Sequence, residues 1–64
     1  MSSVNVFIKS SQGEKSLFEE RIVSAREENG TVVLAMESGE TQALKGAIEE
    51  VDLAEENIVI RSAE

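Results

Sequence analysis

The sequence of 64 residues contains no cysteine and no histidine, and these two absences remove several ways of stabilising a small chain or of making it catalytic. Without cysteine no disulfide bond can form, and without histidine most transition-metal sites are excluded. The usual nucleophile–base pairs of covalent catalysis are built from the same residue types, so we expect no enzyme. A domain of this size buries only about 60% of its unfolded surface, which leaves subunit association as the remaining means of stabilisation. We therefore predict a homodimer.

Aromatic and basic residues are also scarce. Phe7 and Phe18 are the two aromatic residues, and six basic side chains, spread singly among the acids, stand against 13 acidic ones, for a net charge of −7. Proteins that bind nucleic acid need cationic grooves and several stacking rings, so nucleic acid is an unfavourable partner. We expect both phenylalanines to lie in the core or to cover a sheet face.

Long apolar runs are missing as well. No window is long and apolar enough to cross a membrane, and the negative charge disfavours anionic lipid surfaces. The opening MSSVNVFIK lacks the charged region and the uninterrupted apolar stretch of a signal peptide. We expect one globular domain over residues 1–64 that is cytoplasmic and makes no contact with a membrane.

Acidic side chains occur in pairs, at Glu27-Glu28, Glu49-Glu50 and Glu55-Glu56. No loop places oxygen ligands at alternating positions with the glycine and final glutamate of a calcium loop. Successive residues of a strand point to opposite faces, so Glu49 and Glu50 are expected to diverge. We interpret all three pairs as solvated surface and turn residues.

Period-two patterns open and close the chain. Val4, Val6 and Ile8 alternate with Asn5, Phe7 and Lys9, which predicts a strand with one buried face. Turn residues at 10–13 end in Gly13, and a short strand over residues 14–18 would pair back on the first. Residues 45–61 form the densest apolar block and predict a closing pair of strands joined by a turn at 54–57.

The middle of the chain fits two structures. Ser16 and Glu19 form a capping-box pattern, and the apolar spacing that follows is helical up to Gly30. The rival is a hairpin, with strands at 22–27 and 31–36 around Asn29-Gly30, the strongest two-residue hairpin signal. The residues alone leave both structures open here. Turn signals recur every 8–12 residues along the whole chain, however, which favours a small all-β sheet or barrel.

Taken end to end, the sequence resembles the CooT family of small nickel-binding proteins, some of which are labelled predicted RNA-binding proteins. The matching features are the opening MSSVNVFI, the Gly13-Glu14 turn, Ile22-Val23, the Gly39-Glu40 turn, and the run from Gly46 through Ile48, Val51, Asp52 and Leu53 to Ile58-Val59-Ile60. The resemblance covers nearly the whole chain. It implies an all-β, Sm-like or SH3-like, partly open barrel of about six or seven short strands that dimerises. It therefore favours the hairpin over the helix in the middle segment.

The resemblance also implies a metal site at the N-terminus. Members of the family typically begin Met-Cys, and that cysteine is the expected nickel ligand, with backbone nitrogens beside it. This sequence has Ser2 at the position, followed by the backbone of Ser3. A serine hydroxyl keeps its proton near neutral pH and is a poor ligand for a soft or borderline metal. We therefore expect the protein as written to bind nickel weakly or not at all, and we expect Ser2→Cys to restore binding.

These observations predict a nickel-binding accessory protein for the maturation of a nickel enzyme, with Ser2 at the ligand position and a protein partner in that process. The alternatives are a non-catalytic protein-interaction module and, less favoured by the charge, an RNA-binding Sm-like domain. The expected core residues are Val4, Val6, Ile8, Leu17, Ile22, Val32, Leu34, Leu44, Ile48, Val51, Leu53, Ile58 and Ile60.

Overall fold

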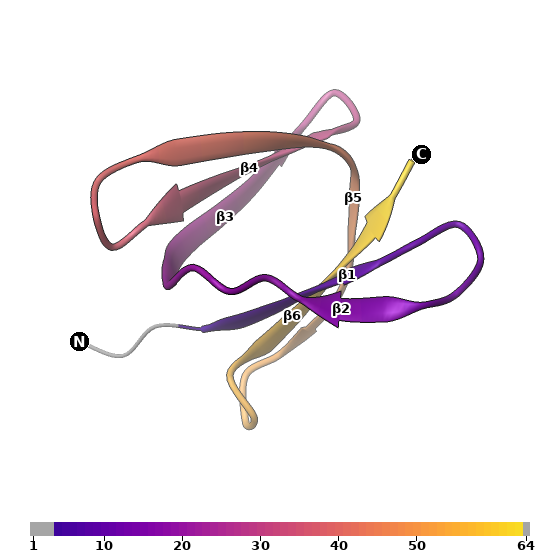
Figure 1. Ribbon diagram of the computed structural model, residues 1–64, viewed down its shortest axis with the longest axis horizontal. Helices are drawn as coiled ribbons and strands as arrows, with labels where there is room; N and C mark the ends of the chain where they lie inside the picture. Colours follow the sequence, from indigo (N-terminus) through magenta and orange to yellow (C-terminus); the bar gives the residue numbers. More distant parts are fainter. Residues whose placement is uncertain (1–3, 64) are drawn as a thin grey trace.

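Six β-strands make up the computed structural model, which describes residues 4–63 (Figure 1). They are β1 (Asn5–Lys9), β2 (Lys15–Leu17), β3 (Ile22–Glu28), β4 (Thr31–Met36), β5 (Thr41–Asp52) and β6 (Asn57–Ser62). No helix occurs in the described range. The all-β prediction is confirmed, and the helical alternative for the middle segment is wrong.

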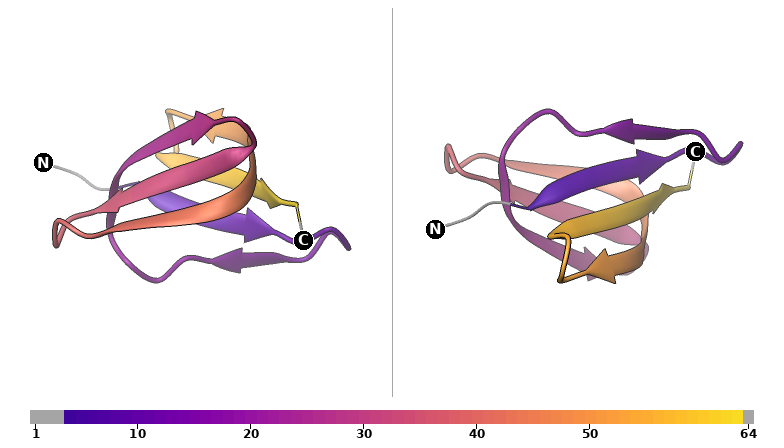
Figure 2. Two further views of the ribbon diagram at one scale, coloured as in Figure 1. Left: turned by 90° about the horizontal axis from the view of Figure 1, so that it is seen from above. Right: turned by 90° about the horizontal axis from the view of Figure 1, so that it is seen from below.

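The strands form one sheet in the order β2-β1-β6-β5-β4-β3. All neighbours are antiparallel except β1 and β6, which run parallel from Asn5 beside Asn57 to Lys9 beside Arg61. The sheet folds over on itself, so that β3 and β4 face β1 and β6, and β5 passes from one layer to the other (Figures 1 and 2). The edge strands β2 and β3 do not pair, and a single bridge between Val4 and Ile22 joins the two layers on that side. The result is the partly open barrel that the resemblance implied.

A glycine allows β5 to serve both layers. The first part of β5 pairs with β4 up to Lys45, and the second part pairs with β6 from Gly46 onward. Gly46 has a φ of 154°, and a Cβ at this position would meet the carbonyl group of Arg61. The strand therefore bends where only a residue without a side chain fits. This bend joins two expected strands into one of 12 residues, so the count is six.

The hairpin between β3 and β4 shows why the middle segment is not a helix. Asn29 and Gly30 have φ values of 50° and 78°, as the two central residues of a type I′ turn require. From this turn, β3 and β4 pair residue by residue back to Ile22 beside Met36, with one irregularity between Ile22 and Ser24. The nonlocal pairing of β4 with β5 then fixes the hairpin in the sheet. The helical spacing in the sequence had no such support.

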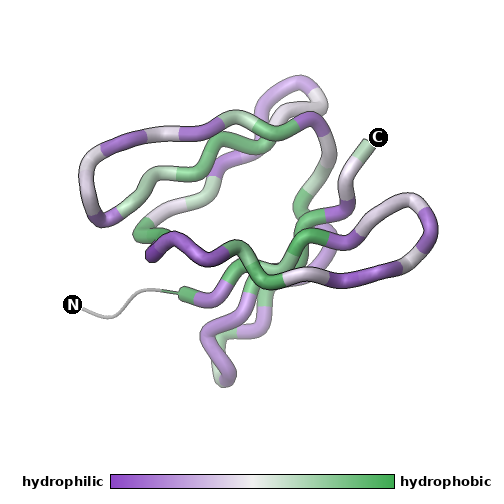
Figure 3. Tube along the Cα trace, viewed as in Figure 1, coloured by the Kyte–Doolittle hydropathy of each residue, from purple (hydrophilic) through white to green (hydrophobic). Residues whose placement is uncertain are grey.

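The apolar core lies between the two layers, where the hydrophobic segments face one another (Figure 3). Its buried members are Val6, Ile22, Val32, Leu34, Met36 and Ile60, with Val4, Phe18, Ala25, Leu44, Ile48 and Ile58 packed against them. Most of the predicted core is therefore confirmed. Met36 was missed because it is the last residue of its strand, next to a turn.

Three predicted core residues are wrong. Leu17 and Val51 are each 53% exposed, and Leu53 is 85% exposed. Leu17 pairs with Phe7, whose side chain points to the outer face of the sheet, away from the core. Val51 and Leu53 lie in the part of the β5–β6 hairpin beyond Lys45, where β4 no longer pairs with β5. No strand of the other layer covers Val51 and Leu53, so their side chains stay exposed.

Candidate functional site

The two residues that the resemblance marks for nickel, Ser2 and the backbone of Ser3, lie outside the described residues. The structure does show where the chain leaves them. The backbone N–H of Val4 donates to the carbonyl oxygen of Ile22 at 3.1 Å, and that of Asn5 donates to Glu56 at 2.9 Å. These bonds hold the start of β1 between β3 and the β5–β6 turn. The backbone is therefore held in place at Val4 and Asn5.

Within residues 4–63 the structure offers no ready metal centre. No group of three or more histidine, cysteine, aspartate or glutamate side chains converges there. No polar or charged side chain of that range is buried. Several of the acids instead contact cations or backbone amides of neighbouring strands. The described part of the chain has neither the donor set nor the enclosure that a resident metal needs.

One surface carries apolar, basic and acidic side chains in rows. It is the face of β2, β1, β6 and the second half of β5 that points away from the core, and we call it the outer face. Strand register sets side chains into rows that run across these strands. One row is apolar, with Leu17 beside Phe7 and Phe7 beside Val59. Val59 is only 7% exposed, although it points away from the core, because Phe7 and the neighbouring rows cover it. Phe7 thus covers a sheet face while Phe18 packs in the core, as the sequence predicted for the pair.

The next row along the strands is cationic. Lys9 lies between Lys15 on one side and Arg61 on the other, each directly opposite it in the register. Like charges in directly opposed positions destabilise a sheet. The structure therefore corrects the expectation of isolated basic residues: half of the basic side chains of this acidic chain stand in one row.

One glutamate offsets part of that charge. Glu49 contacts the ammonium of Lys9 at 3.2 Å and the guanidinium of Arg61 at 3.9 Å. It can do so because the register of β5 against β6 shifts between Ile48 and Glu50, where a bulge breaks the alternation of faces. The expectation that Glu49 and Glu50 diverge is therefore wrong. Lys15 has a different partner, since its ammonium lies over the ring of Phe7, 5.8 Å from the centroid.

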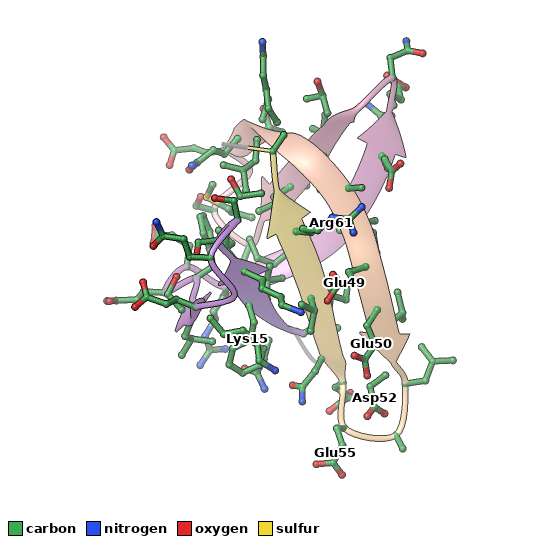
Figure 4. The ribbon with its side chains drawn as sticks, turned by 90° about the vertical axis from the view of Figure 1, so that its right-hand side faces the viewer. Lys15, Glu49, Glu50, Asp52, Glu55 and Arg61 are labelled. Atoms are coloured by element: carbon green, nitrogen blue, oxygen red, sulfur yellow. The ribbon has the colours of Figure 1, made fainter. Side chains whose placement is uncertain are left out.

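Acidic residues continue along β5 from the apolar row to the turn. Glu50 stands beside Val59 in the apolar row, and Asp52 stands at the far end beside Asn57, which is hydrogen-bonded to Asn5 at 3.2 Å. A carboxylate oxygen of Asp52 accepts the backbone N–H of Glu55 at 3.1 Å and so shapes the turn into β6. Figure 4 shows the progression along β5 and β6 from Arg61 and Glu49 through Glu50 to Asp52 and Glu55.

A shallow hollow of about 200 Å³ lies in this face, lined by Phe7, Lys15, Glu50, Asp52, Asn57 and Val59. A larger one of about 530 Å³ lies beside the β1–β2 hairpin and the end of β6, lined by Ile8, Ser10, Glu14, Lys15, Ser16 and Ser62. Both hollows combine charged, polar and apolar side chains, which suits recognition of another molecule by charge and apolar contact.

Comparison with known proteins supplies the family. The sequence profile described as "CO dehydrogenase accessory protein CooT" matches residues 1–61. The chain belongs to the CooT family. The resemblance seen in the sequence is thereby confirmed, and so is the expectation that the protein is not an enzyme, because the family is one of accessory proteins.

A solved structure supports the same fold. The chain is similar to the crystal structure of a "putative CooT" from Carboxydothermus hydrogenoformans, with a TM-score of 0.76 and 19% sequence identity. The match covers 97% of this chain and 98% of the other. No curated protein matches the sequence. The CooT description links the chain to the maturation of carbon monoxide dehydrogenase, an accessory role that implies a protein partner. In the described residues, no helix is long and apolar enough to cross a membrane.

Proposed function

We propose that the protein is a cytoplasmic accessory factor in the maturation of a nickel enzyme, with Ser2 at the position where the family's nickel ligand is expected. The family match over residues 1–61 carries this proposal, because it extends through the position of the ligand. In this role nickel is cargo, to be passed to an enzyme. The accessory protein itself contributes binding and docking.

The donor chemistry of this chain does not fit a tight nickel site. No thiol or imidazole is present anywhere in the sequence, and no acidic cluster in residues 4–63 replaces them. The hydroxyl of Ser2 and the backbone nitrogens around Ser3 are weak donors for nickel compared with a thiolate. We propose that this chain binds nickel weakly or not at all and that its contribution to maturation is made through protein contacts.

Nickel titration of four proteins tests this proposal. Calorimetry and the thiolate-to-nickel absorption band are measured on the chain as written and on Ser2→Cys, Ser2→Ala and Ser11→Cys. We expect weak or no binding by the chain as written and by Ser2→Ala, and tight binding by Ser2→Cys. Ser11→Cys is the matched control, since it places a single thiol in an exposed turn. Tight binding by the Ser2 form would show that the ligands lie elsewhere, and equal binding by both cysteine variants would show that position 2 has no special role.

The small core supports association as part of the proposed function. Only six buried apolar side chains form the core cluster of the described residues, so a second copy or a partner would add stabilising contacts. We propose a homodimer that also engages a protein partner. A pull-down that returns one stoichiometric protein, with or without nickel, would favour the interaction module over the metal carrier. RNA is a weaker candidate, because Glu49 already contacts two of the three cations on the outer face.

A further inference from the structure

One edge of the sheet has an open side. The strand order places β2 and β3 at the two edges, and β2 lies at the border of the sheet (Figure 2). The edge of β3 is tied to the other layer at both ends. The carbonyl oxygen of Ile22 accepts the backbone N–H of Val4 at 3.1 Å, and the carboxylate of Glu27 accepts that of Ile48 at 2.8 Å. Within residues 4–63, by contrast, β2 pairs with β1 alone.

The hydrogen bonds between β1 and β2 determine which backbone groups of β2 face the open side. The N–H of Phe18 donates to the carbonyl oxygen of Val6 at 2.8 Å, directly after β2. In an antiparallel pair, alternate residues direct their N–H and C=O groups to the neighbouring strand. Ser16 therefore bonds to β1, whereas the N–H and C=O groups of Lys15 and Leu17 point to the open side.

We propose that an extended segment of a protein partner adds to this open side of β2 as a further strand, antiparallel to it. In strand addition, the backbone hydrogen bonds provide affinity and the flanking side chains provide specificity. The antiparallel direction is the more stable one per residue. The inference rests on the protein partner of the proposed function and names the chemistry of the segment that this partner presents.

Two residues of the segment are set by side chains of β2 on the outer face. Leu17 is 53% exposed beside Phe7. Lys15 lies over the ring of Phe7 and takes part in none of the ion pairs within residues 4–63. Apolar pairs and pairs of opposite charge in directly opposed positions stabilise neighbouring strands. The segment therefore has an apolar residue opposite Leu17 and an acidic residue opposite Lys15.

Two more residues are set by side chains on the other face of β2. Ser16 and Glu14 line the hollow of about 530 Å³ beside the β1–β2 hairpin. The carboxylate of Glu14 takes part in none of the ion pairs within residues 4–63, so a basic residue opposite it supplies the missing charge. The residue opposite Ser16 lies over the hollow and is polar. In its own chain direction, the segment therefore reads apolar, polar, acidic, basic.

Two synthetic peptides test this pattern. Both are capped at each end and flanked by threonines, and their central residues are Val-Thr-Glu-Lys in the matching peptide and Val-Thr-Lys-Glu in the swapped one. The protein variant is Glu14→Lys/Lys15→Glu, which exchanges the two charges on β2 and leaves the net charge unchanged. Amide NMR titration measures affinity and locates the contact, and circular dichroism confirms that the variant is folded.

We expect the original chain to bind the matching peptide about tenfold more tightly than the swapped one, and we expect the variant to reverse this preference. Amide shifts should concentrate at Lys15, Ser16 and Leu17. N-methylation of the matching peptide separates backbone pairing from charge attraction. A methyl group on its glutamate, whose N–H faces Lys15, should abolish binding, whereas one on its threonine, whose N–H points away from β2, should leave binding unchanged.

Several results would overturn the proposal. They are equal affinity for the two peptides, equal effects of the two methyl groups, shifts away from β2, and no binding of either peptide at about 1 mM. Amide protection of Lys15 and Leu17 that rises with protein concentration in the absence of peptide would assign the edge to a second copy instead. A protein partner that binds the variant as tightly as the original chain would overturn this edge and keep the proposed function, whose nickel titration at position 2 is independent of β2.

Discussion

Replacement of Gly46 by alanine tests the claim that one residue lets β5 serve both layers of the barrel. The added Cβ would meet the carbonyl oxygen and carbon of Arg61 and the Cα of Ser62, which are all backbone atoms of β6. Backbone atoms of a paired strand cannot move aside as the end of a long side chain can. The substitution therefore separates β5 from β6 at the point where the N–H of Ala63 donates to the carbonyl of Lys45 at 3.0 Å.

Two costs add at this position. A φ of 154° is outside the range that an alanine adopts without strain, and such strain costs about 1–3 kcal/mol. Forcing a methyl group into a closely packed site costs about 1–3 kcal/mol more. We expect a loss of at least about 2 kcal/mol. At roughly 0.05–0.15 kcal/mol per residue, that loss is comparable with the whole stability of a chain of this length.

Urea denaturation followed by circular dichroism measures the effect, since the chain has no tryptophan or tyrosine to report by fluorescence. With a slope of about 1 kcal/mol per molar urea for so small a domain, the midpoint should fall by at least about 2 M. Gly13→Ala is the matched control, because Gly13 has a φ of 91° but no heavy atom within 4 Å of an added Cβ. That variant should lose only the backbone term, about 1–2 kcal/mol. Equal losses for the two variants would refute the close approach of β5 and β6 as the reason for glycine.

Two further predictions concern packing and hydrogen bonding. Ile60→Ala should lower the free energy of unfolding by about 2–5 kcal/mol because Ile60 is fully buried, whereas Leu53→Ala should change it by less than about 0.5 kcal/mol; similar losses in thermal or urea unfolding would contradict the placement of the core. Glu27→Ala should cost about 1 kcal/mol, because a carboxylate oxygen of Glu27 accepts the backbone N–H of Ile48 at 2.8 Å at the start of the bulge in β5. Glu27→Gln keeps an acceptor and should retain most of that stability, and amide hydrogen exchange at Ile48 should quicken in the alanine variant alone.

Local patterns in the sequence predicted most of the strands because each had its own signal. Apolar residues alternate with others at Val4, Val6 and Ile8, which predicts a strand. The pair Asn29-Gly30 predicts a type I′ turn. The helical spacing around Phe18 was misleading, since a spacing of three and four residues also arises where a loop joins two strands. The residues alone did not decide between a helix and a hairpin there. The family resemblance favoured the hairpin.

The errors in the core share a physical cause. The predicted core treated every apolar residue of the closing strands as facing inward, but the layers overlap only in part. Val51 lies beyond the reach of β4, and Leu17 is on the outer face because its partner is Phe7. Which part of a long hairpin is covered depends on where β5 bends, and Gly46 marks that point only once its contact with Arg61 is known.

The outer face was the hardest feature to predict, and its residues show why. A hairpin around residues 10–13 was expected, so the pairing of Lys9 with Lys15 could have been derived from the turn. Arg61 reaches the same row only because β6 runs parallel to β1, a contact across most of the chain that no local signal encodes. Glu49 joins them only because a bulge breaks the alternation of β5. Basic residues that are scattered along the sequence thus form one row on the sheet. The parallel pairing of β1 with β6 brings them together, and the bulge in β5 brings Glu49 to them.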